Sequence, residues 1–314
     1  MTREALPVSL VVTSFNEVRN VLAWCKSLLA MDTWPSEIIV ADSDSTDGTV
    51  DELRRCLDGH LHLVILRGRC SISEGRNKAI SAAANENVVI TDFGVTFDRS
   101  WLRNMHSVLV TNDWAGGCYI ITAGNPIQNA FARLFDVEPE RLVEASFLPS
   151  SRSFGVRRSV FIAANGYDTS LVLGEDTALV LKLRGLGLRY QLARNAVVHW
   201  HPRESLHAIY VQNYRYAYWD GRASQNAGRW LHIAFWIVIS MAALTGSLVA
   251  GWQGAAGGLA VSAAILYAKV APNTLRCSSH SLPQILDLVV YYTTTTGSAL
   301  GYLAGSFARL RRPA

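Results

Sequence analysis

The sequence predicts an α/β domain with a mostly parallel sheet, followed by a C-terminal α-helical membrane region. Short apolar runs rich in β-branched residues alternate with amphipathic helical segments, which is the pattern of βαβ units. Each run ends in a cluster of polar residues. Residues 233–268 contain no charged side chain, and neither do residues 288–308. We therefore expect an α/β domain over 1–203, an interfacial helix and linker over 204–228, and membrane-associated helices over 229–314.

The first half of the domain has the clearest pattern. Pro35 is expected to end the continuation of the first helix. Before Gly94 we expect strands over 8–13, 37–41, 61–66 and 88–91, and helices over 18–29, 47–56 and 73–84. After Gly94 we expect strands over 114–122 and 197–200, and helices over 100–110, 128–145 (with a break near Pro139), 159–165 and 175–186.

Composition excludes some functions. The net charge of +4 is small, and no lysine-rich block occurs, so a nucleic-acid partner is not expected. The five cysteines are odd in number and have no metal-ligand spacing, which indicates reduced packing residues of a cytosolic domain. The N-terminus lacks the apolar core of a signal peptide, so we expect no cleaved leader.

The stretch Asn87–Gly94 organises the candidate site. Its apolar run is typical of a strand buried on both faces of a parallel sheet. Asp92 then follows the carboxyl end of this strand, where open α/β sheets bind their ligands. The alternative is that Asp92 caps the helix after Phe97.

Five polar clusters carry a family resemblance. They are Thr13-Ser14-Phe15-Asn16-Glu17, Asp42 to Thr49, Gly75-Arg76-Asn77, Thr91-Asp92-Phe93-Gly94 and Gly174-Glu175-Asp176-Thr177. Taken in order over residues 8–203, they resemble the family 2 glycosyltransferases, in a membrane-anchored branch. The resemblance implies a GT-A fold that binds a nucleotide sugar.

The resemblance assigns the nucleotide-binding residues. It places Ser14, Glu17 and Asp42 at the nucleoside, where a carboxylate accepts hydrogen bonds from a base or a ribose. Arg76 and Asn77 match the family's Arg-Asn pair, and the guanidinium would offset the charge of the diphosphate. Asp47 also matches a family motif, but we interpret it as a residue that holds the turn before the second helix.

The resemblance also assigns a metal and a catalytic base. Asp92 matches the first acid of the Asp-x-Asp motif, which binds a divalent ion, Mg²⁺ or Mn²⁺, at the diphosphate. Gly94 replaces the second acid, as in the Asp-x-Gly variant of this branch. Asp176 matches the general base that deprotonates the acceptor in inverting members. The alternative is that Glu175 and Asp176 only complement the helix dipole.

Further residues extend the candidate site to the acceptor and the diphosphate. They are Glu175, Arg152, Gln212 and Arg215. Gln212 and Arg215 resemble the Gln-x-x-Arg-Trp signature of polysaccharide synthases, with Tyr216 in place of Trp. The alternative for this segment is an interfacial aromatic helix. His199 and His201 are two residues apart, a spacing that metal ligands can have. The alternative is that this pair at the end of a strand has a structural role, which is more common.

The uncharged segments predict the membrane topology. Residues 233–268 suit a hairpin that spans the bilayer, with a turn near Trp252. Residues 288–308 are only mildly apolar and are expected to re-enter or lie in the interface. This arrangement keeps Arg309, Arg311 and Arg312 on the cytoplasmic side, as the positive-inside rule favours.

The expected function is that of a membrane-associated inverting glycosyltransferase. It would move a sugar from a nucleotide sugar, with UDP favoured, to a lipid-linked or glycan acceptor in polysaccharide or glycolipid synthesis. Membrane lipid is a further expected partner, and the catalytic domain would face the cytoplasm at the inner membrane. The alternatives are a processive polysaccharide synthase and a catalytically inactive scaffold that keeps the fold.

Overall fold

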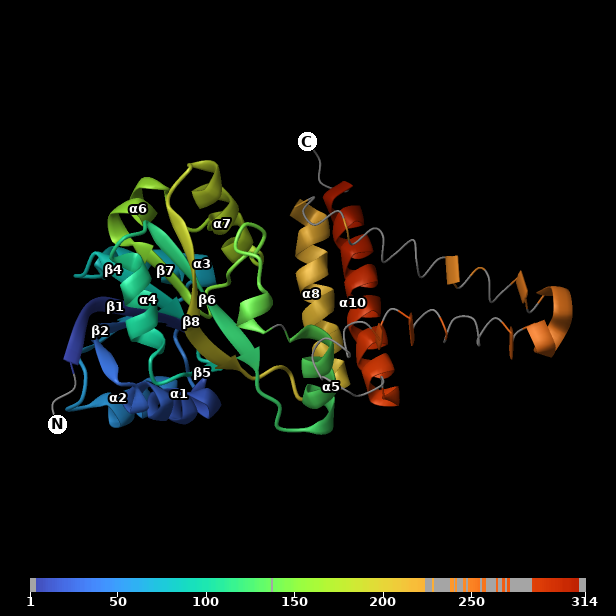
Figure 1. Cartoon of the computed structure of the whole chain (residues 1–314), viewed down its shortest axis with the longest axis horizontal. Coiled ribbons are helices and arrows are strands. Elements are labelled where there is room, and N and C mark those ends of the chain that lie inside the picture. The colour runs from blue at the N-terminus through green and yellow to red at the C-terminus, as the bar shows by residue number, and fades with distance from the viewer. Residues whose placement is uncertain are drawn as a thin grey trace. The chain divides into compact units, whose positions relative to one another are not determined.

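The computed structural model describes residues 4–136, 138–223, 284–310 and scattered positions between 228 and 271. The chain forms two compact units (Figure 1). Unit 1 comprises residues 1–120 and 138–200, and unit 2 comprises residues 121–137 and 201–314. The segment 121–137, which the sequence places inside the catalytic domain, thus belongs to unit 2.

Unit 1 contains an eight-stranded sheet with the order β3-β2-β1-β4-β7-β6-β8-β5. The strands β1, β2, β3 and β4 pair in parallel, as the sequence predicts. The strand β7 is antiparallel to both β4 and β6, and β5 is antiparallel to β8. The strands are β1 (Glu4–Ser14), β2 (Thr33–Asp42), β3 (Leu63–Arg67), β4 (Asn87–Thr91), β5 (Val95–Phe97), β6 (Trp114–Ile121), β7 (Phe154–Arg157) and β8 (Tyr190–Trp200).

The expectation of a mostly parallel sheet is therefore corrected to a mixed sheet. Only the first four strands are linked in sequence by crossover helices, which is the connection that makes neighbouring strands parallel. The short strand β5 was not predicted, because three residues are too few to show an alternating pattern. Pro35 lies inside β2, so this strand begins before the start predicted at residue 37.

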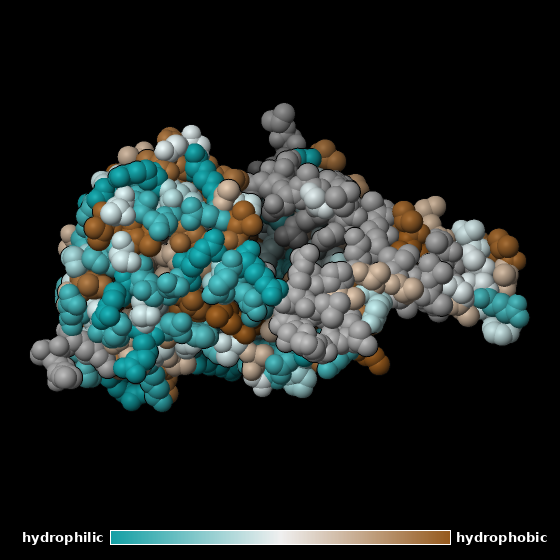
Figure 2. Space-filling model, in the orientation of Figure 1, coloured by the Kyte–Doolittle hydropathy of each residue, from teal (hydrophilic) through white to brown (hydrophobic). Residues whose placement is uncertain are grey.

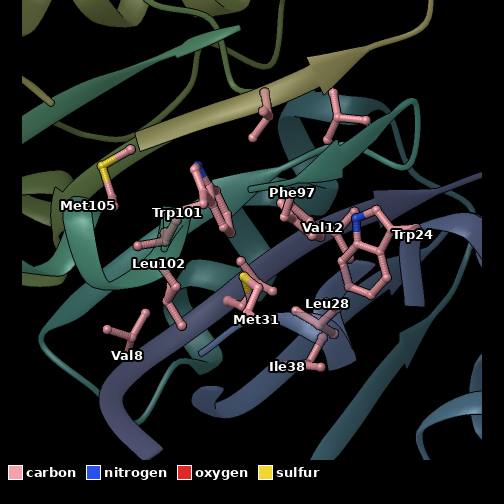
Figure 3. Packing of buried hydrophobic residues seen from close by; sticks show 14 of the residues in the cluster. Val8, Val12, Trp24, Leu28, Met31, Ile38, Phe97, Trp101, Leu102 and Met105 are labelled. Atoms are coloured by element: carbon pink, nitrogen blue, oxygen red, sulfur yellow. The ribbon is translucent and has the colours of Figure 1, made fainter. Parts of the chain in front are cut away.

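Both faces of the sheet are covered, which explains the continuous apolar runs in β1, β2 and β4. In β1, Val8, Leu10 and Val12 join one core cluster and Val11 joins the other. The first cluster receives side chains from α1, α2 and α4, including Trp24, which is fully buried (Figure 3). The second receives side chains from α3, α6 and α7.

The helices of unit 1 follow the predicted positions closely. They are α1 (Val18–Ala30), α2 (Thr49–Leu57), α3 (Ile72–Ala82), α4 (Trp101–Leu109), α6 (Arg158–Ala163) and α7 (Glu175–Gly185). The helix predicted over 128–145 is wrong in its second half, where a short 3-10 turn at Pro139–Arg141 leads into irregular chain. Figure 2 shows mostly hydrophilic side chains on the visible face of unit 1, as its composition indicates.

Unit 2 contains α5 (Pro126–Phe135), α8 (Leu206–Ala223) and α10 (Ile285–Leu310). The backbones of α8 and α10 are in direct contact. A Cβ added at Gly301 or Gly305 would lie about 2 Å from a carbonyl oxygen of α8. Arg133 of α5 forms an ion pair with the fully buried Asp287 of α10, with a distance of 2.5 Å between Nη2 and Oδ1. The helix expected within 204–228 is present as α8, over Leu206–Ala223, and its interfacial role stays a prediction.

The membrane region does not gain support from the structure. Most of the predicted hairpin over 233–268 lies outside the described residues. The segment 288–308 forms most of α10, which contains few charges but also a run of threonines and three glycines. Within the part of the chain that the structure describes, no helix combines the length and the apolarity that crossing a membrane requires.

Candidate active site

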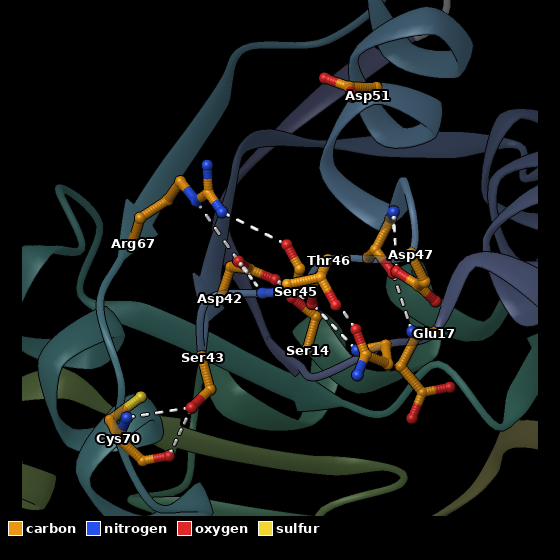
Figure 4. Close-up of polar contacts among 12 residues, drawn as sticks. Ser14, Glu17, Asp42, Ser43, Ser45, Thr46, Asp47, Asp51, Arg67 and Cys70 are labelled. Carbon is orange, nitrogen blue, oxygen red and sulfur yellow. Dashed lines mark hydrogen bonds and ion pairs between the residues drawn. The ribbon is translucent and has the colours of Figure 1, made fainter.

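The carboxyl ends of β1 and β2 are joined by a hydrogen-bonded network around Asp42 (Figure 4). Ser14 Oγ donates to Asp42 Oδ1 at 2.7 Å, and Ser45 donates to the same carboxylate through its Oγ at 2.6 Å and its backbone N–H at 3.0 Å. Asp42 is fully buried. Its predicted role as a nucleoside acceptor remains a prediction, but its observed role is to shape the loop on which a nucleoside would lie.

The loop after β1 is fixed by the loop after β2. Asn16 has a positive φ of 56°, and its backbone N–H donates to Ser45 Oγ at 2.9 Å. Asp47 accepts from the backbone N–H of Val18 at 3.0 Å and from that of Thr49 at 3.0 Å. The interpretation of Asp47 as a turn-holding residue is therefore confirmed. Glu17 also joins this contact, because its backbone N–H donates to the Thr49 hydroxyl at 2.8 Å.

Two residues near this network were missed by the sequence analysis. Arg67, the last residue of β3, has its Nε 3.5 Å from Asp42 Oδ2 and a side chain that is 52% exposed. Phe15 is 63% exposed beside Ser14. Both residues lie at the end of a parallel strand, and this position could have identified them. Acids and amides at such positions were taken as candidates, but these two side chains were not.

The centre of the candidate site is a guanidinium held by three carboxylates. Arg76 of α3 donates to Asp92 Oδ1 at 2.9 Å, to Glu175 Oε1 at 2.9 Å and to Asp176 Oδ1 at 3.0 Å. Asp92 follows β4, and the other two acids lie in the first turn of α7. The structure thus brings together four of the predicted site residues. It excludes Asp92 as a cap of α4, which begins after Ser100.

Burial and charge act in opposite directions on this cluster. Burial favours a neutral Arg76, but the carboxylates of Asp176 and Asp92 outweigh burial and hold the pKa of Arg76 well above its usual range. Burial raises the pKa of Glu175, and the neighbouring Asp176 raises it further, against the effect of Arg76. With all three acids ionised, the cluster has an excess negative charge.

Ser151 orients the carboxylate of Asp176. The backbone N–H of Ser151 donates to Asp176 Oδ2 at 3.1 Å, and the hydroxyl of Ser151 donates to Asp176 Oδ1. The same hydroxyl lies 2.7 Å from the phenol oxygen of Tyr167, a residue whose pKa is raised mainly by burial. Oδ1 thus has two donors and Oδ2 has one, so Oδ2 keeps the greater capacity to accept another proton.

Asn77 forms two hydrogen bonds with the backbone of Tyr167. Its Nδ2 donates to the carbonyl of Tyr167 at 2.9 Å, and its Oδ1 accepts from the backbone N–H of Tyr167 at 2.9 Å. The amide side chain therefore fixes the backbone that carries Tyr167. Its contact with a nucleotide stays a prediction.

Arg152 lies on an aromatic pair. Its guanidinium carbon is 4.4 Å from the ring centroid of Trp200 and 5.6 Å from that of Tyr119, and the two rings pack edge to face. The carbonyl of Arg152 accepts from the hydroxyl of Thr91 at 3.0 Å, next to Asp92. Gln212 and Arg215 lie on α8 of unit 2, and their predicted contact with acceptor and diphosphate stays a prediction.

Few of the described side chains in the site could coordinate a divalent cation. Among the described residues, no three His, Cys, Asp or Glu side chains are grouped as a metal site. The side chain of Asp92 is 35% exposed, and its Oδ1 accepts a hydrogen bond from Arg76. A Cβ added at Gly94 would meet no atom within 4 Å. These residues fit an ion that takes one protein carboxylate and completes its shell with ligand oxygens and water.

The two histidines predicted as a possible metal site fall in different compact units. His199 has its Nε2 2.7 Å from Asp98 Oδ1, at the pairing of β8 with β5. His201 belongs to unit 2. The contact of His199 favours the structural alternative for this residue.

Comparison with known proteins finds a family match for the N-terminal part of the chain. Residues 9–145 match the family model described as Glycosyl transferase family 2. A search of the curated proteins finds no match.

Solved structures resemble the chain over most of its length. A mannosyltransferase, PcManGT from Pyrobaculum calidifontis, in complex with GDP-Man and Mn²⁺, is 21% identical with a TM-score of 0.63, and the match covers 94% of this chain and 88% of that one. TarS 1–349 from S. aureus in complex with UDP-GlcNAc is 15% identical with a TM-score of 0.53, over 98% and 93% of the two chains. At these identities the likeness shows the fold, which is GT-A-like.

The burial of Arg76 predicts a large cost for its removal. In the Arg76→Gln variant three acids lose their cation, so we expect the free energy of unfolding to fall by about 3–5 kcal/mol at neutral pH. In the variant, Glu175 loses the cation that opposes the effect of burial, so its folded-state pKa would rise further above its unfolded value. The deficit should be smallest near pH 4, below the ordinary Glu pKa of about 4.3, and should grow as pH rises through the raised value.

Urea unfolding at several pH values measures this effect. Arg103→Gln is the matched control, since Arg103 pairs with Asp32 at 3.3 Å but is 55% exposed in its side chain. Its loss should cost below about 1 kcal/mol at every pH. Equal deficits in the two variants would contradict the assigned role of Arg76.

Proposed function

The chain belongs through residues 9–145 to the family 2 glycosyltransferases, and we propose that it transfers a sugar with inversion from a nucleoside-diphosphate sugar to an acceptor hydroxyl. The observation that carries this proposal is the Asp176 carboxylate. It lies beside Arg76 and Asp92, is oriented by Ser151, and is 24% exposed in its side chain. An oriented and accessible carboxylate is what a general base requires.

The reaction would be a single displacement. The acceptor oxygen forms a bond to the anomeric carbon while the bond from that carbon to the phosphate oxygen breaks. The acceptor proton moves to Asp176, where Oδ2 accepts only the backbone N–H of Ser151 at 3.1 Å. The electron pair of the broken bond leaves with the nucleoside diphosphate. One displacement inverts the configuration, and no covalent enzyme intermediate is needed.

The donor would lie along the carboxyl edge of β1, β2 and β4. The nucleoside would contact the loop that starts at Ser14 and the exposed ring of Phe15, which offers a flat apolar face to a base. The structures that resemble this chain were solved with GDP-Man and with UDP-GlcNAc, which supports a nucleotide-sugar donor. We propose UDP as the nucleotide, because it is common in the family.

A divalent metal ion, Mg²⁺ or Mn²⁺, would be held by Asp92. When bound, it would neutralise the charge that develops on the leaving nucleoside diphosphate. The excess negative charge of the Arg76 cluster favours a cation at this position, since Asp92, Glu175 and Asp176 share one guanidinium. The resemblance to a structure solved with Mn²⁺ also supports this proposal.

We propose that the protein works at the cytoplasmic face of the inner membrane on a lipid-linked or glycan acceptor. The uncharged residues 233–268 support this proposal, as do the basic residues on either side of them. Nucleotide sugars are made in the cytoplasm, which places the catalytic unit on the same side.

The first prediction concerns the base. Asp176→Asn keeps the shape of the side chain but cannot accept a proton, so kcat should fall roughly 100- to 10,000-fold while the donor still binds. Purified protein is first assayed against a panel of nucleotide sugars for release of nucleoside diphosphate. Donor binding to the variant is then measured by calorimetry. Retained turnover in the variant would overturn the assignment of Asp176.

The second prediction concerns the metal. Gly94→Asp adds a carboxylate in open space beside Asp92, so Mn²⁺ should bind more tightly in the presence of nucleoside diphosphate. Gly94→Asn is the matched control for size, and it should have a smaller effect. Electron paramagnetic resonance of Mn²⁺ measures both affinities. Unchanged binding in both variants would move the metal away from this loop.

The third prediction concerns the membrane. The full chain should stay in the membrane fraction after extraction with sodium carbonate, because the uncharged segment would be inserted and not adsorbed. A periplasm-dependent reporter fused after Ala314 should be inactive. Release by carbonate would contradict insertion, and an active reporter would contradict the proposed side of the C-terminus.

A further inference from the structure

Tyr167 contributes a phenol hydroxyl to the network around the proposed base. Its oxygen lies 2.7 Å from Ser151 Oγ, and Ser151 in turn hydrogen-bonds to Asp176 Oδ1. Tyr167 and Ser151 are both 2% exposed, so bulk water is excluded from their hydroxyl groups. We propose that Tyr167 is a positioning residue, which acts through Ser151 to hold the Asp176 carboxylate in the orientation that a base requires. This inference rests on the role of Asp176 in the proposed function.

The direction of each hydrogen bond follows from the number of protons available. An ionised carboxylate only accepts hydrogen bonds, so Ser151 uses its single hydroxyl proton for Asp176. Ser151 can then only accept from the phenol of Tyr167. The phenol keeps its proton, because burial raises the pKa of Tyr167 and outweighs the opposite effect of Arg76. The donors therefore run in one direction, from Tyr167 through Ser151 to Asp176.

This chain of donors distinguishes the two oxygens of Asp176. Oδ1 accepts from Ser151 Oγ and from Arg76 Nη1 at 3.0 Å, while Oδ2 accepts from the backbone N–H of Ser151 at 3.1 Å. A hydroxyl that itself accepts a hydrogen bond is a stronger donor, so the phenol strengthens the bond from Ser151 to Oδ1. The carboxylate is thereby fixed against rotation, with Oδ2 left to take the proton of the acceptor.

The backbone and the ring of Tyr167 are held from several sides. Asn77 Nδ2 donates to the carbonyl of Tyr167 and Asn77 Oδ1 accepts from its N–H, both at 2.9 Å. The preceding Gly166 has a φ of 53°, and a Cβ there would lie 2.6 Å from Asn77 Oδ1. The guanidinium carbon of Arg76 lies 5.3 Å from the centroid of the Tyr167 ring. The phenol oxygen therefore occupies one fixed position.

The kinetic experiment compares the wild-type full chain with Tyr167→Phe, Ser151→Ala and the double variant. Tyr167→Phe removes the phenol oxygen and keeps the ring, so kcat for release of nucleoside diphosphate should fall roughly 3- to 10-fold, the size of one hydrogen bond. KM for the nucleotide sugar and the binding of UDP in calorimetry should not change, because the bond acts on the base and not on the donor. In Ser151→Ala the phenol has lost its partner, so adding Tyr167→Phe should not lower kcat further.

Tyr190→Phe is the matched control. The hydroxyl of Tyr190 is also buried in unit 1, but it has no hydrogen-bond partner among the residues that the structure describes. Its removal should leave kcat and KM at the wild-type values. Thermal melting of each variant checks that the fold is kept.

Urea unfolding tests the same hydrogen bonds without an assay of activity. Tyr167→Phe should lower the urea midpoint of the wild type, because the buried Ser151 hydroxyl loses its donor. It should leave the midpoint of Ser151→Ala unchanged or raise it, because the phenol of that variant is already buried without a partner. Equal decreases in the two backgrounds would show that Tyr167 does not act through Ser151.

The inference would also be overturned by an unchanged kcat in a folded Tyr167→Phe, by a loss of donor binding that accounts for the slower rate, or by effects of the two substitutions that multiply in the double variant. A failure of the proposed function would be seen separately, as a wild-type protein that releases no nucleoside diphosphate from any nucleotide sugar. The urea comparison would still decide whether Tyr167 acts on Ser151.

Discussion

The ion cluster around Arg76 is the constraint on which the candidate site depends. One buried guanidinium joins α3 to the end of β4 and to the first turn of α7, so three segments far apart in the sequence meet at one point. Taking a guanidinium out of water is unfavourable by itself, and only close carboxylates compensate for it. The arginine and the acids therefore require one another, and each helix or strand that carries one of them is fixed in position by the others.

The imbalance of charge in this cluster connects structure to function. Three carboxylates share one cation, and the neighbouring Asp176 contributes to the raised pKa of Glu175. A diphosphate alone would add negative charge and would be repelled. A diphosphate that arrives with a divalent cation adds much less net negative charge. The excess negative charge of this cluster thus favours the proposed metal-bound donor over a free one.

The sequence predicted the first half of unit 1 well, for a physical reason. Strands β1, β2 and β4 are buried on both faces, so they are continuous apolar runs that end where the chain reaches solvent. Asp92 was found from its position after a parallel strand, and Asp176 was assigned from the family resemblance. Which polar residues point inward could not be predicted. Asp42 and Asn77 share the residue types of ligand-binding positions, and their partners are a buried serine and a backbone segment.

The second half of unit 1 was predicted less well, because its pairings are antiparallel and long-range. Strands β5 and β7 have three and four residues, too few for a pattern, and they are defined by partners distant in the sequence. The irregular chain before Ser151 has apolar residues at helical spacing, although it forms no helix after Arg141. Tertiary contacts override local preference in such segments.

The irregular chain has a function that a helix could not supply. Ser151, Arg152 and Ser153 are consecutive, and they contact the base, the aromatic pair and the core in turn. Ser151 and Arg152 lie in a turn and Ser153 in a bend, so their side chains do not follow a regular repeat. A helix would rotate successive side chains by about 100° each, as its 3.6 residues per turn require. The close approach also limits the neighbouring strand, since a Cβ at Gly117 of β6 would lie 1.9 Å from Ser153 Oγ. A side chain at Gly117 would therefore displace Ser153, which lies two residues after the serine that orients Asp176.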